Sequence, residues 1–186
     1  MKTALLASYG KDEALLRLGK MLSERGWSIL GSAGTAKFLN DNAIPCRDVG
    51  GIVGAPILGH RVVTLAREIY AGLLATDADA EELQKLGIDR IDLVYVTLYP
   101  LEKTIADPNS SPADVIEKTD IGGPTLLRAA AKGRRIVLSS AEQFDEFEKR
   151  IAEETFDETY LTHLAAAAER RVAEYVNVSA SYWEEK

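Results

Sequence analysis

Short runs of apolar and β-branched residues alternate with helical patterns along most of the chain, and this alternation restricts the possible folds more than any other feature. The runs occupy residues 3–7, 27–30, 45–49, 91–98 and 135–139. Such alternation is typical of parallel strands joined by crossover helices. We therefore predict an α/β fold, a three-layer sandwich around a mainly parallel sheet. The run at 91–98 is the densest in apolar and β-branched residues, and we expect it to be the central strand.

Apolar spacing and turn residues place the helices and loops between these runs. Helical patterns cover residues 12–25, 78–86, 123–132, 141–151 and 156–183, and a short helix is expected after residues 31–35. Loops are expected at 49–60, which is rich in Gly and Pro, and at 102–112. Loops that follow strands often carry functional residues.

Composition excludes several classes of protein. The length predicts one domain spanning residues 1–186, with a helical C-terminal segment. Acidic residues outnumber basic ones by 29 to 22, and the net charge of −7 makes nucleic acid an unfavourable partner. The longest apolar stretch, 69–75, is far shorter than the roughly 20 residues of a membrane span, so no membrane role is expected. The single cysteine, Cys46, cannot form an internal disulfide, and a cytoplasmic location is expected.

The sequence gives no pattern typical of a metal site. His60 and His163 are far apart in the chain, and neither has Cys or carboxylate neighbours at metal-ligand spacing. Cys46 lies in a strand-like segment without a nearby base, which favours a buried structural thiol over a nucleophile. We therefore expect no bound metal.

The sequence Gly-Ser-Ala-Gly-Thr at residues 31–35 leaves a strand and enters a helix. Backbone N–H groups at such a helix start, with the hydroxyls of Ser32 and Thr35 and the open backbone at Gly34, can hold a phosphate. Three further residues with cationic or hydroxyl side chains are candidate partners of the same anion: Lys11, Arg61 and Thr64. A tight turn capped by Thr35 explains the motif equally well.

Residues 119–124 read Thr-Asp-Ile-Gly-Gly-Pro and precede a helix. Gly122 and Gly123 leave backbone N–H groups unpaired at the helix start, and Asp120 beside them is a candidate acid, base or hydrogen-bond acceptor. Asp120 can equally serve only as a helix cap. Lys132 lies in the last turn of this helix, where a lysine normally complements the helix dipole.

Tyr99 follows the expected central strand, at the edge of the sheet where open α/β proteins bind their ligands. Its phenol is a candidate donor of a proton or a hydrogen bond. A tyrosine that ends a strand can also simply cover the core.

Four stretches of the sequence together resemble one known family. They are Gly-Ser-Ala-Gly-Thr-Ala from residue 31, Gly-His-Arg-Val-Val-Thr-Leu from residue 59, Asp-Leu-Val-Tyr-Val-Thr-Leu-Tyr-Pro from residue 92 and Asp-Ile-Gly-Gly-Pro-Thr-Leu-Leu-Arg-Ala-Ala-Ala-Lys from residue 120. Over nearly its whole length the chain resembles the IMP cyclohydrolase domain, the N-terminal part of the bifunctional purine-biosynthesis protein. The resemblance implies a methylglyoxal synthase-like fold, and the family's formyltransferase domain is not expected in this chain.

The resemblance also implies a reaction, the dehydrative closure of 5-formamidoimidazole-4-carboxamide ribotide to IMP without a metal or organic cofactor. The carboxamide nitrogen loses a proton as it attacks the formyl carbon, the formyl oxygen gains negative charge, and a hydroxyl leaves as water. In the family these tasks fall to four residues, and three of them match Tyr99, Asp120 and Lys132. The implied partners are a phosphorylated purine-precursor nucleotide and a second copy in a homodimer, and a separate formyltransferase is a candidate source of substrate.

The fourth position departs from the family pattern. Val63 stands where the family has a lysine, Ala66 replaces a histidine, Arg67 replaces a proline and Thr97 replaces an asparagine. Loss of one group that stabilises a developing oxyanion costs about 100- to 1000-fold in rate. Lys11 and Arg67 are candidate substitutes for the missing cation, and ring closure within one molecule keeps the acceleration that comes from positioning.

Three functions follow. The first is IMP cyclohydrolase activity through Tyr99, Asp120 and Lys132. The second, favoured by Val63 and Ala66, is a noncatalytic or regulatory domain of the same fold that binds a phosphorylated nucleotide or sugar. The third, methylglyoxal synthase activity, rests on the fold alone.

Overall fold

The predicted α/β architecture is confirmed by the computed structural model, which describes residues 1–59 and 61–185. The strands are β1 (Thr3–Ser8), β2 (Ser28–Gly31), β3 (Arg47–Asp48), β4 (Leu93–Thr97) and β5 (Ile136–Leu138). In the described ranges they form one five-stranded sheet with the order β3-β2-β1-β4-β5. All four pairings are parallel, so the sheet is parallel throughout rather than mainly parallel.

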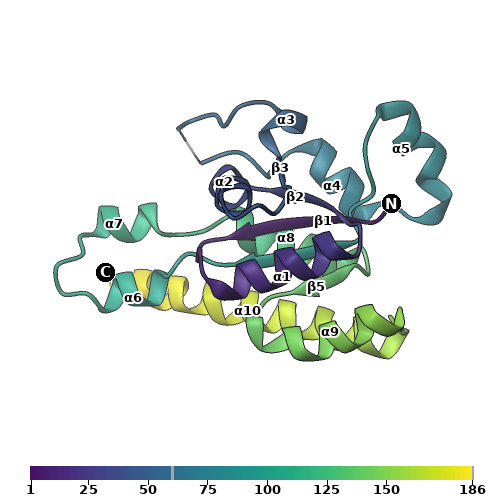
Figure 1. Cartoon of the computed structure of the whole chain (residues 1–186). Helices are drawn as coiled ribbons and strands as arrows, with labels where there is room; N and C mark the ends of the chain where they lie inside the picture. Colours follow the sequence, from purple (N-terminus) through teal and green to yellow (C-terminus); the bar gives the residue numbers. More distant parts are fainter. Residues whose placement is uncertain (60, 186) are drawn as a thin grey trace.

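Helices of two size classes surround this sheet. The longer ones are α1 (Glu13–Glu24), α2 (Ala33–Asp41), α4 (Arg67–Leu74), α8 (Gly122–Lys132), α9 (Phe144–Glu153) and α10 (Glu158–Glu184). The shorter segments are α3 (Gly50–Val53), η1 (Asp77–Asp79), α5 (Ala80–Leu86), α6 (Leu101–Ala106), α7 (Pro112–Glu117) and η2 (Ala141–Gln143). Figure 1 shows α1 in front of the strands and α8 behind them, which gives the expected three layers.

Apart from the edge strand β3, whose two residues Arg47 and Asp48 are exposed, the strands are mainly apolar, because helices cover both faces of the sheet. Leu5 on β1 is in register with Leu30 on β2 and with Val94 on β4, and none of the three is more than 1% exposed. β1 occupies the middle of the sheet. β4, which was expected to be central, is the neighbouring interior strand and is paired on both sides.

Three segments differ from the sequence-based expectation. The loop expected at 102–112 contains most of α6, and a capping box between Ser111 and Asp114 then starts α7. The loop expected at 49–60 contains the short helix α3. The helix α4 was not predicted: its N-terminus has no side-chain cap, and the burial of Ile69 and Leu73 in the core holds it in place.

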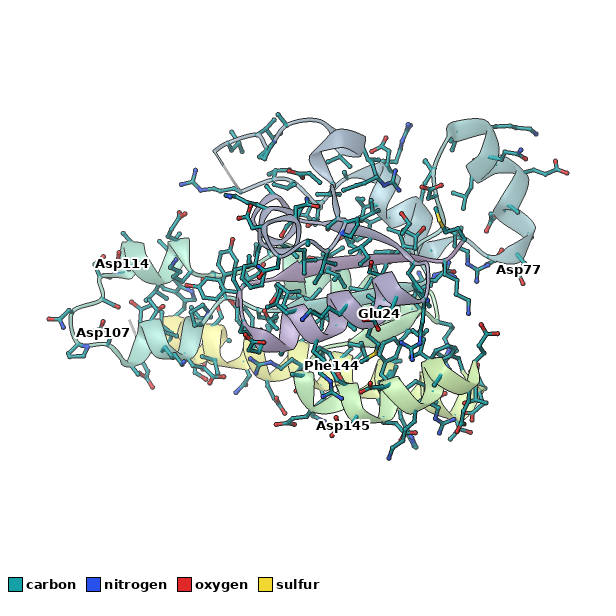
Figure 2. All side chains as sticks on the ribbon, viewed as in Figure 1. Glu24, Asp77, Asp107, Asp114, Phe144 and Asp145 are labelled. Carbon is teal, nitrogen blue, oxygen red and sulfur yellow. The ribbon has the colours of Figure 1, made fainter. Side chains whose placement is uncertain are left out.

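The carboxyl ends of β1, β2 and β4 point to the same end of the molecule because the strands are parallel. α6 and α7 project from this end, at the left of Figure 1. Figure 2 labels Asp107 and Asp114 on the outer part of this projection. The segments that follow the three strands therefore lie together, at the edge of the sheet where Tyr99 was predicted to lie. Among the helices in the described ranges, none combines the length and apolar composition of a membrane span.

Candidate active site

A cleft of about 540 Å³ lies where β1, β2 and β4 end. Nine of the residues expected from the sequence line it: Lys11, Ser32, Gly34, Arg61, Thr64, Tyr99, Asp120, Gly122 and Gly123. They come from five separate stretches of the chain, and the parallel sheet brings these stretches to one edge. The cleft therefore contains both the phosphate-cradle residues and two of the three expected catalytic residues.

The loop between β1 and α1 forms part of the cleft and is fixed by Thr97 at the end of β4. The Tyr9 N–H donates to Thr97 Oγ1 at 2.8 Å, and the Ser8 hydroxyl lies 2.8 Å from the same oxygen. Lys11 Nζ donates to the Ser8 and Tyr9 carbonyl oxygens, at 3.3 Å in the case of Tyr9. Burial lowers the pKa of Lys11, and Asp12 opposes this effect. These contacts hold the Lys11 ammonium beside the cleft.

The start of α2 lies next to this loop. A Cβ atom at Gly34 would be 3.5 Å from Lys11 Cε, so Lys11 lies along the first turn of α2. Thr35 does not line the cleft. It is fully buried, and its Oγ1 accepts the Ser8 N–H at 3.2 Å and the Ser32 hydroxyl at 3.0 Å. Thr35 therefore holds the cradle together from beneath and leaves Ser32 and Gly34 at the surface of the cleft.

Asp120 lies at the N-terminus of α8. The Gly123 N–H donates to Asp120 Oδ1 at 2.9 Å. A Cβ atom at Gly123 would be 2.5 Å from Asp120 Oδ2 and 2.7 Å from Leu98 Cδ2, so a larger residue here would displace the Asp120 carboxyl group. Burial raises the pKa of Asp120, while backbone N–H groups, chiefly that of Gly123, act in the opposite direction. A carboxyl group with a raised pKa is suited to proton transfer.

Tyr99 belongs to a cluster of two aromatic rings and one cation. Its ring centroid is 5.2 Å from that of Tyr9, and Lys118 Nζ lies 5.8 Å from both centroids. Burial raises the pKa of Tyr99, and the negative charges of Asp120 and Glu117 raise it further. The Tyr99 phenol therefore keeps its proton and can donate a hydrogen bond into the cleft.

The missing family lysine leaves an apolar wall. Val63 lines the cleft and is half-buried. Arg61 also lines the cleft, where it forms an ion pair with Glu117 at 3.2 Å. Arg67, a candidate substitute for the lysine, starts α4 with its side chain 80% exposed and does not line the cleft. Lys11 therefore has a better position to substitute than Arg67.

Lys132 lies apart from the other expected catalytic residues. It is exposed in the last turn of α8 and does not line the cleft. With a rise of about 1.5 Å per residue, the helix places it about 14 Å along the axis from Gly123. The structure therefore brings together Tyr99 and Asp120 but not Lys132.

No metal centre is formed by the residues that the structure describes. Within 1–59 and 61–185, no three His, Cys, Asp or Glu side chains gather closely enough to hold a metal ion. His60 lies outside the described residues. Cys46 is buried, and burial raises the pKa of its thiol to about 12, which makes it a poor nucleophile.

Several residues at the site were not assigned from the sequence. Ser8, Tyr9 and Thr97 join the first loop to β4, and Lys118 lies against the tyrosine rings. Thr97 falls at a position where the sequence departs from the family pattern, and that departure was the available signal. Lys118 gave no signal, because its role depends on where the segment after α7 lies.

An all-parallel sheet with a cleft at the carboxyl ends of its strands defines the class of this protein: an α/β domain that binds its ligand at the sheet edge. The sequence profile of the MGS-like domain matches residues 14–125. The chain belongs to the MGS-like domain family.

Curated relatives match most or nearly all of the chain. The bifunctional purine biosynthesis protein PurH of Prochlorococcus marinus is 37% identical over 190 residues, which cover 98% of this chain and 36% of that protein. PurH of Thermosynechococcus vestitus is 44% identical over 152 residues, covering 78% of this chain and 29% of that protein. The crystal structure of ForH superimposes with a TM-score of 0.88 at 30% identity and covers 99% of this chain and 97% of that chain. The chain spans about a third of the length of the curated relatives that it matches.

Proposed function

We propose that this chain closes the purine ring of 5-formamidoimidazole-4-carboxamide ribotide, giving IMP and water. The observation that carries the proposal is that Tyr99 and Asp120 share one cleft with the start of α8 and with the loop at Lys11 and Ser32. A set of proton-transfer groups and a set of anion-binding groups thus lie within one volume. The relatives named PurH support a purine-precursor substrate.

Each step of the reaction has a residue of the cleft to perform it. Asp120 accepts the proton that the carboxamide nitrogen loses as it forms its bond to the formyl carbon. Tyr99 donates a hydrogen bond to the formyl oxygen as negative charge develops on it, and this oxygen then takes up the proton that Asp120 carries and becomes a hydroxyl. The bond between carbon and this hydroxyl then breaks as the formamido nitrogen forms a double bond to the same carbon, and the hydroxyl leaves as water with the proton of that nitrogen. The N–H groups at the start of α8 favour the negative charge that develops during the attack.

The 5′-phosphate binds at the other set of residues. Lys11 contributes positive charge, Ser32 contributes a hydroxyl, and Gly34 leaves the backbone N–H groups at the start of α2 accessible. Because the chain carries a net charge of −7, these local groups decide where an anionic ligand is held.

A second candidate function is a noncatalytic domain that binds a phosphorylated nucleotide. Val63 favours it, because an apolar side chain lines the cleft where the family pattern has a cation. The two functions predict the same binding and differ in turnover.

The experiment that separates them measures turnover and binding on one preparation. Purified protein is mixed with 5-formamidoimidazole-4-carboxamide ribotide, IMP formation is followed spectroscopically, and thermal protection by IMP is measured in parallel. The proposal expects enzyme-dependent IMP formation above the uncatalysed rate. Protection by IMP without turnover would support the noncatalytic domain instead.

We also propose a homodimer and a separate formyltransferase that supplies the substrate in the cytoplasm. Exposed apolar side chains on α10, including Val176 and Trp183, offer a surface for pairing. Light scattering after size exclusion is expected to give twice the chain mass of 20.3 kDa. A monomer at working concentration would contradict the dimer.

A further inference from the structure

The hydroxyl of Tyr175 lies beneath the segment that joins α7 to α8. Tyr175 is on α10 and is 2% exposed. Its hydroxyl donates to the Lys118 carbonyl oxygen at 3.1 Å and accepts the Asp120 N–H at 2.7 Å. Burial raises the pKa of Tyr175 to about 12, so the phenol is protonated at neutral pH and can donate and accept at the same time.

The segment that receives these bonds belongs to neither helix nor strand. Its two ends carry side chains that are in the cleft or contact it: the Lys118 ammonium lies against the rings of Tyr9 and Tyr99, and Asp120, which lines the cleft, accepts the Gly123 N–H. Backbone groups that lose their partners when buried cost free energy, so the phenol hydroxyl favours one path of this segment over others. A single side chain on α10 therefore constrains both the aromatic cluster and the carboxyl group.

We propose that Tyr175 is a positioning residue of the cleft, whose hydroxyl holds residues 118–120 so that Asp120 stays at the start of α8 and Lys118 stays beside Tyr99. Its catalytic consequence rests on the proposed function, whereas its geometric part does not. The family profile ends at residue 125, so α10 contributes to the site from outside the matched region.

The test compares Tyr175→Phe with a matched control on the same helix. Tyr160 is also buried, at 5% exposed, and its hydroxyl has no hydrogen-bond partner within the part of the chain that the structure describes. Tyr160→Phe therefore removes one buried hydroxyl from α10 without releasing residues 118–120. Two readouts without substrate are amide hydrogen exchange at Asp120 and the titration of its carboxyl group by carbon NMR. A third readout is the split between kcat and KM for ring closure.

Three results are expected for Tyr175→Phe relative to Tyr160→Phe. Exchange of the Asp120 amide is faster by about tenfold or more, because its acceptor is gone. The pKa of Asp120 falls toward the ordinary aspartate range, because burial is the main cause of its raised value and a released segment admits water. The titratable side chains that face Asp120 are Tyr99 and Tyr175. The kcat falls by about tenfold or more while KM changes less, because Asp120 is misplaced and the phosphate groups are not.

Equal exchange and equal titration in the two variants would overturn the inference whatever the activity. Absence of ring closure by the unchanged protein would overturn the proposed function, and exchange and titration would still decide the role of Tyr175. If Tyr175→Phe fails to fold, the unchanged protein supplies the test. Its Asp120 amide is then expected to exchange as slowly as the core amide of Leu127 on α8, and exchange at the rate of an open loop would overturn the inference.

Discussion

The protonation of individual residues in this cleft depends on their surroundings more than on the type of side chain. Asp120 has a raised pKa because it is buried, and Tyr99 keeps its proton because it is buried beside negative charge. Val63 supplies neither charge nor hydrogen bond to the wall that it forms. The cleft thus combines groups for proton transfer with a missing cation, and this combination can be tested by substitution.

Val63→Lys is expected to raise the rate of ring closure by about 100- to 1000-fold, because a cation near the developing oxyanion stabilises the transition state. Val63→Met is the matched control, since it adds length without charge. Initial rates at saturating substrate check this prediction. Equal rates for two folded variants would show that the missing cation does not limit this protein.

Asp120→Asn is expected to stabilise the protein near neutral pH. The pKa of the Asp120 carboxyl is higher in the folded state than in the unfolded state, where it is 3.8. The contribution of this carboxyl to the free energy of unfolding is therefore favourable below pH 3.8 and is lost as the pH rises through the folded-state pKa. Asparagine keeps an oxygen acceptor for the Gly123 N–H and never ionises. Urea unfolding below pH 3.8 and near neutral pH is expected to show that the stability gained by Asp120→Asn over the unchanged protein increases with pH. A gain independent of pH would contradict the raised pKa.

Some helices and strands of this fold can be recognised from local sequence patterns, whereas others depend on contacts between residues that are distant in the chain. β1 and β4 follow directly from their apolar runs, and α8 follows from the paired glycines and its apolar spacing. The helix α4 has no side-chain cap at its start. At its other end, the side chain of Arg135, the residue before β5, donates a hydrogen bond to the Leu73 carbonyl oxygen. That contact joins residues 62 apart in the chain, so no local pattern reports it.

Arg135→Met is expected to destabilise the fold by about 2 to 4 kcal/mol, because a buried charged donor to several carbonyl groups is lost. Arg135 is 3% exposed, and it donates to the Leu73 carbonyl oxygen at 2.8 Å and also to that of Ala75. Arg134 is the control: its side chain is 39% exposed and pairs with Glu158, so Arg134→Met is expected to cost less than about 1 kcal/mol. Urea unfolding measures both, and equal losses would contradict the capping role.

The candidate site likewise combines residues that have local sequence signatures with residues placed by long-range contacts. Motifs in the sequence located the loop at Ser32 and the start of α8, because turn chemistry and helix starts have local signatures. They did not locate the hydroxyl of Tyr175, which reaches Asp120 across 55 residues of chain. They also placed Lys132 with the catalytic residues, whereas the helix carries it away from the cleft.

The molecule as a whole assembles its cleft from segments that are distant in the chain. The β1–α1 loop, the start of α2, the end of β4 and the start of α8 meet because the parallel sheet directs them to one edge. α10 supports this edge from behind through Tyr175. Function at this scale depends on whether the assembled cleft performs chemistry or only binds.

The rate of single-turnover ring closure by Asp120→Asn, compared with that of Asp145→Asn, tests most directly whether the cleft performs chemistry. Asp145 is the control because its side chain is 79% exposed in an ion pair with Arg17, and Figure 2 shows it on α9 at the lower edge of the molecule. The account predicts a loss of about 100-fold or more for Asp120→Asn and a change of less than about twofold for Asp145→Asn, as expected of an exposed surface charge. Equal rates for the two variants would contradict the assignment of this cleft as the active site.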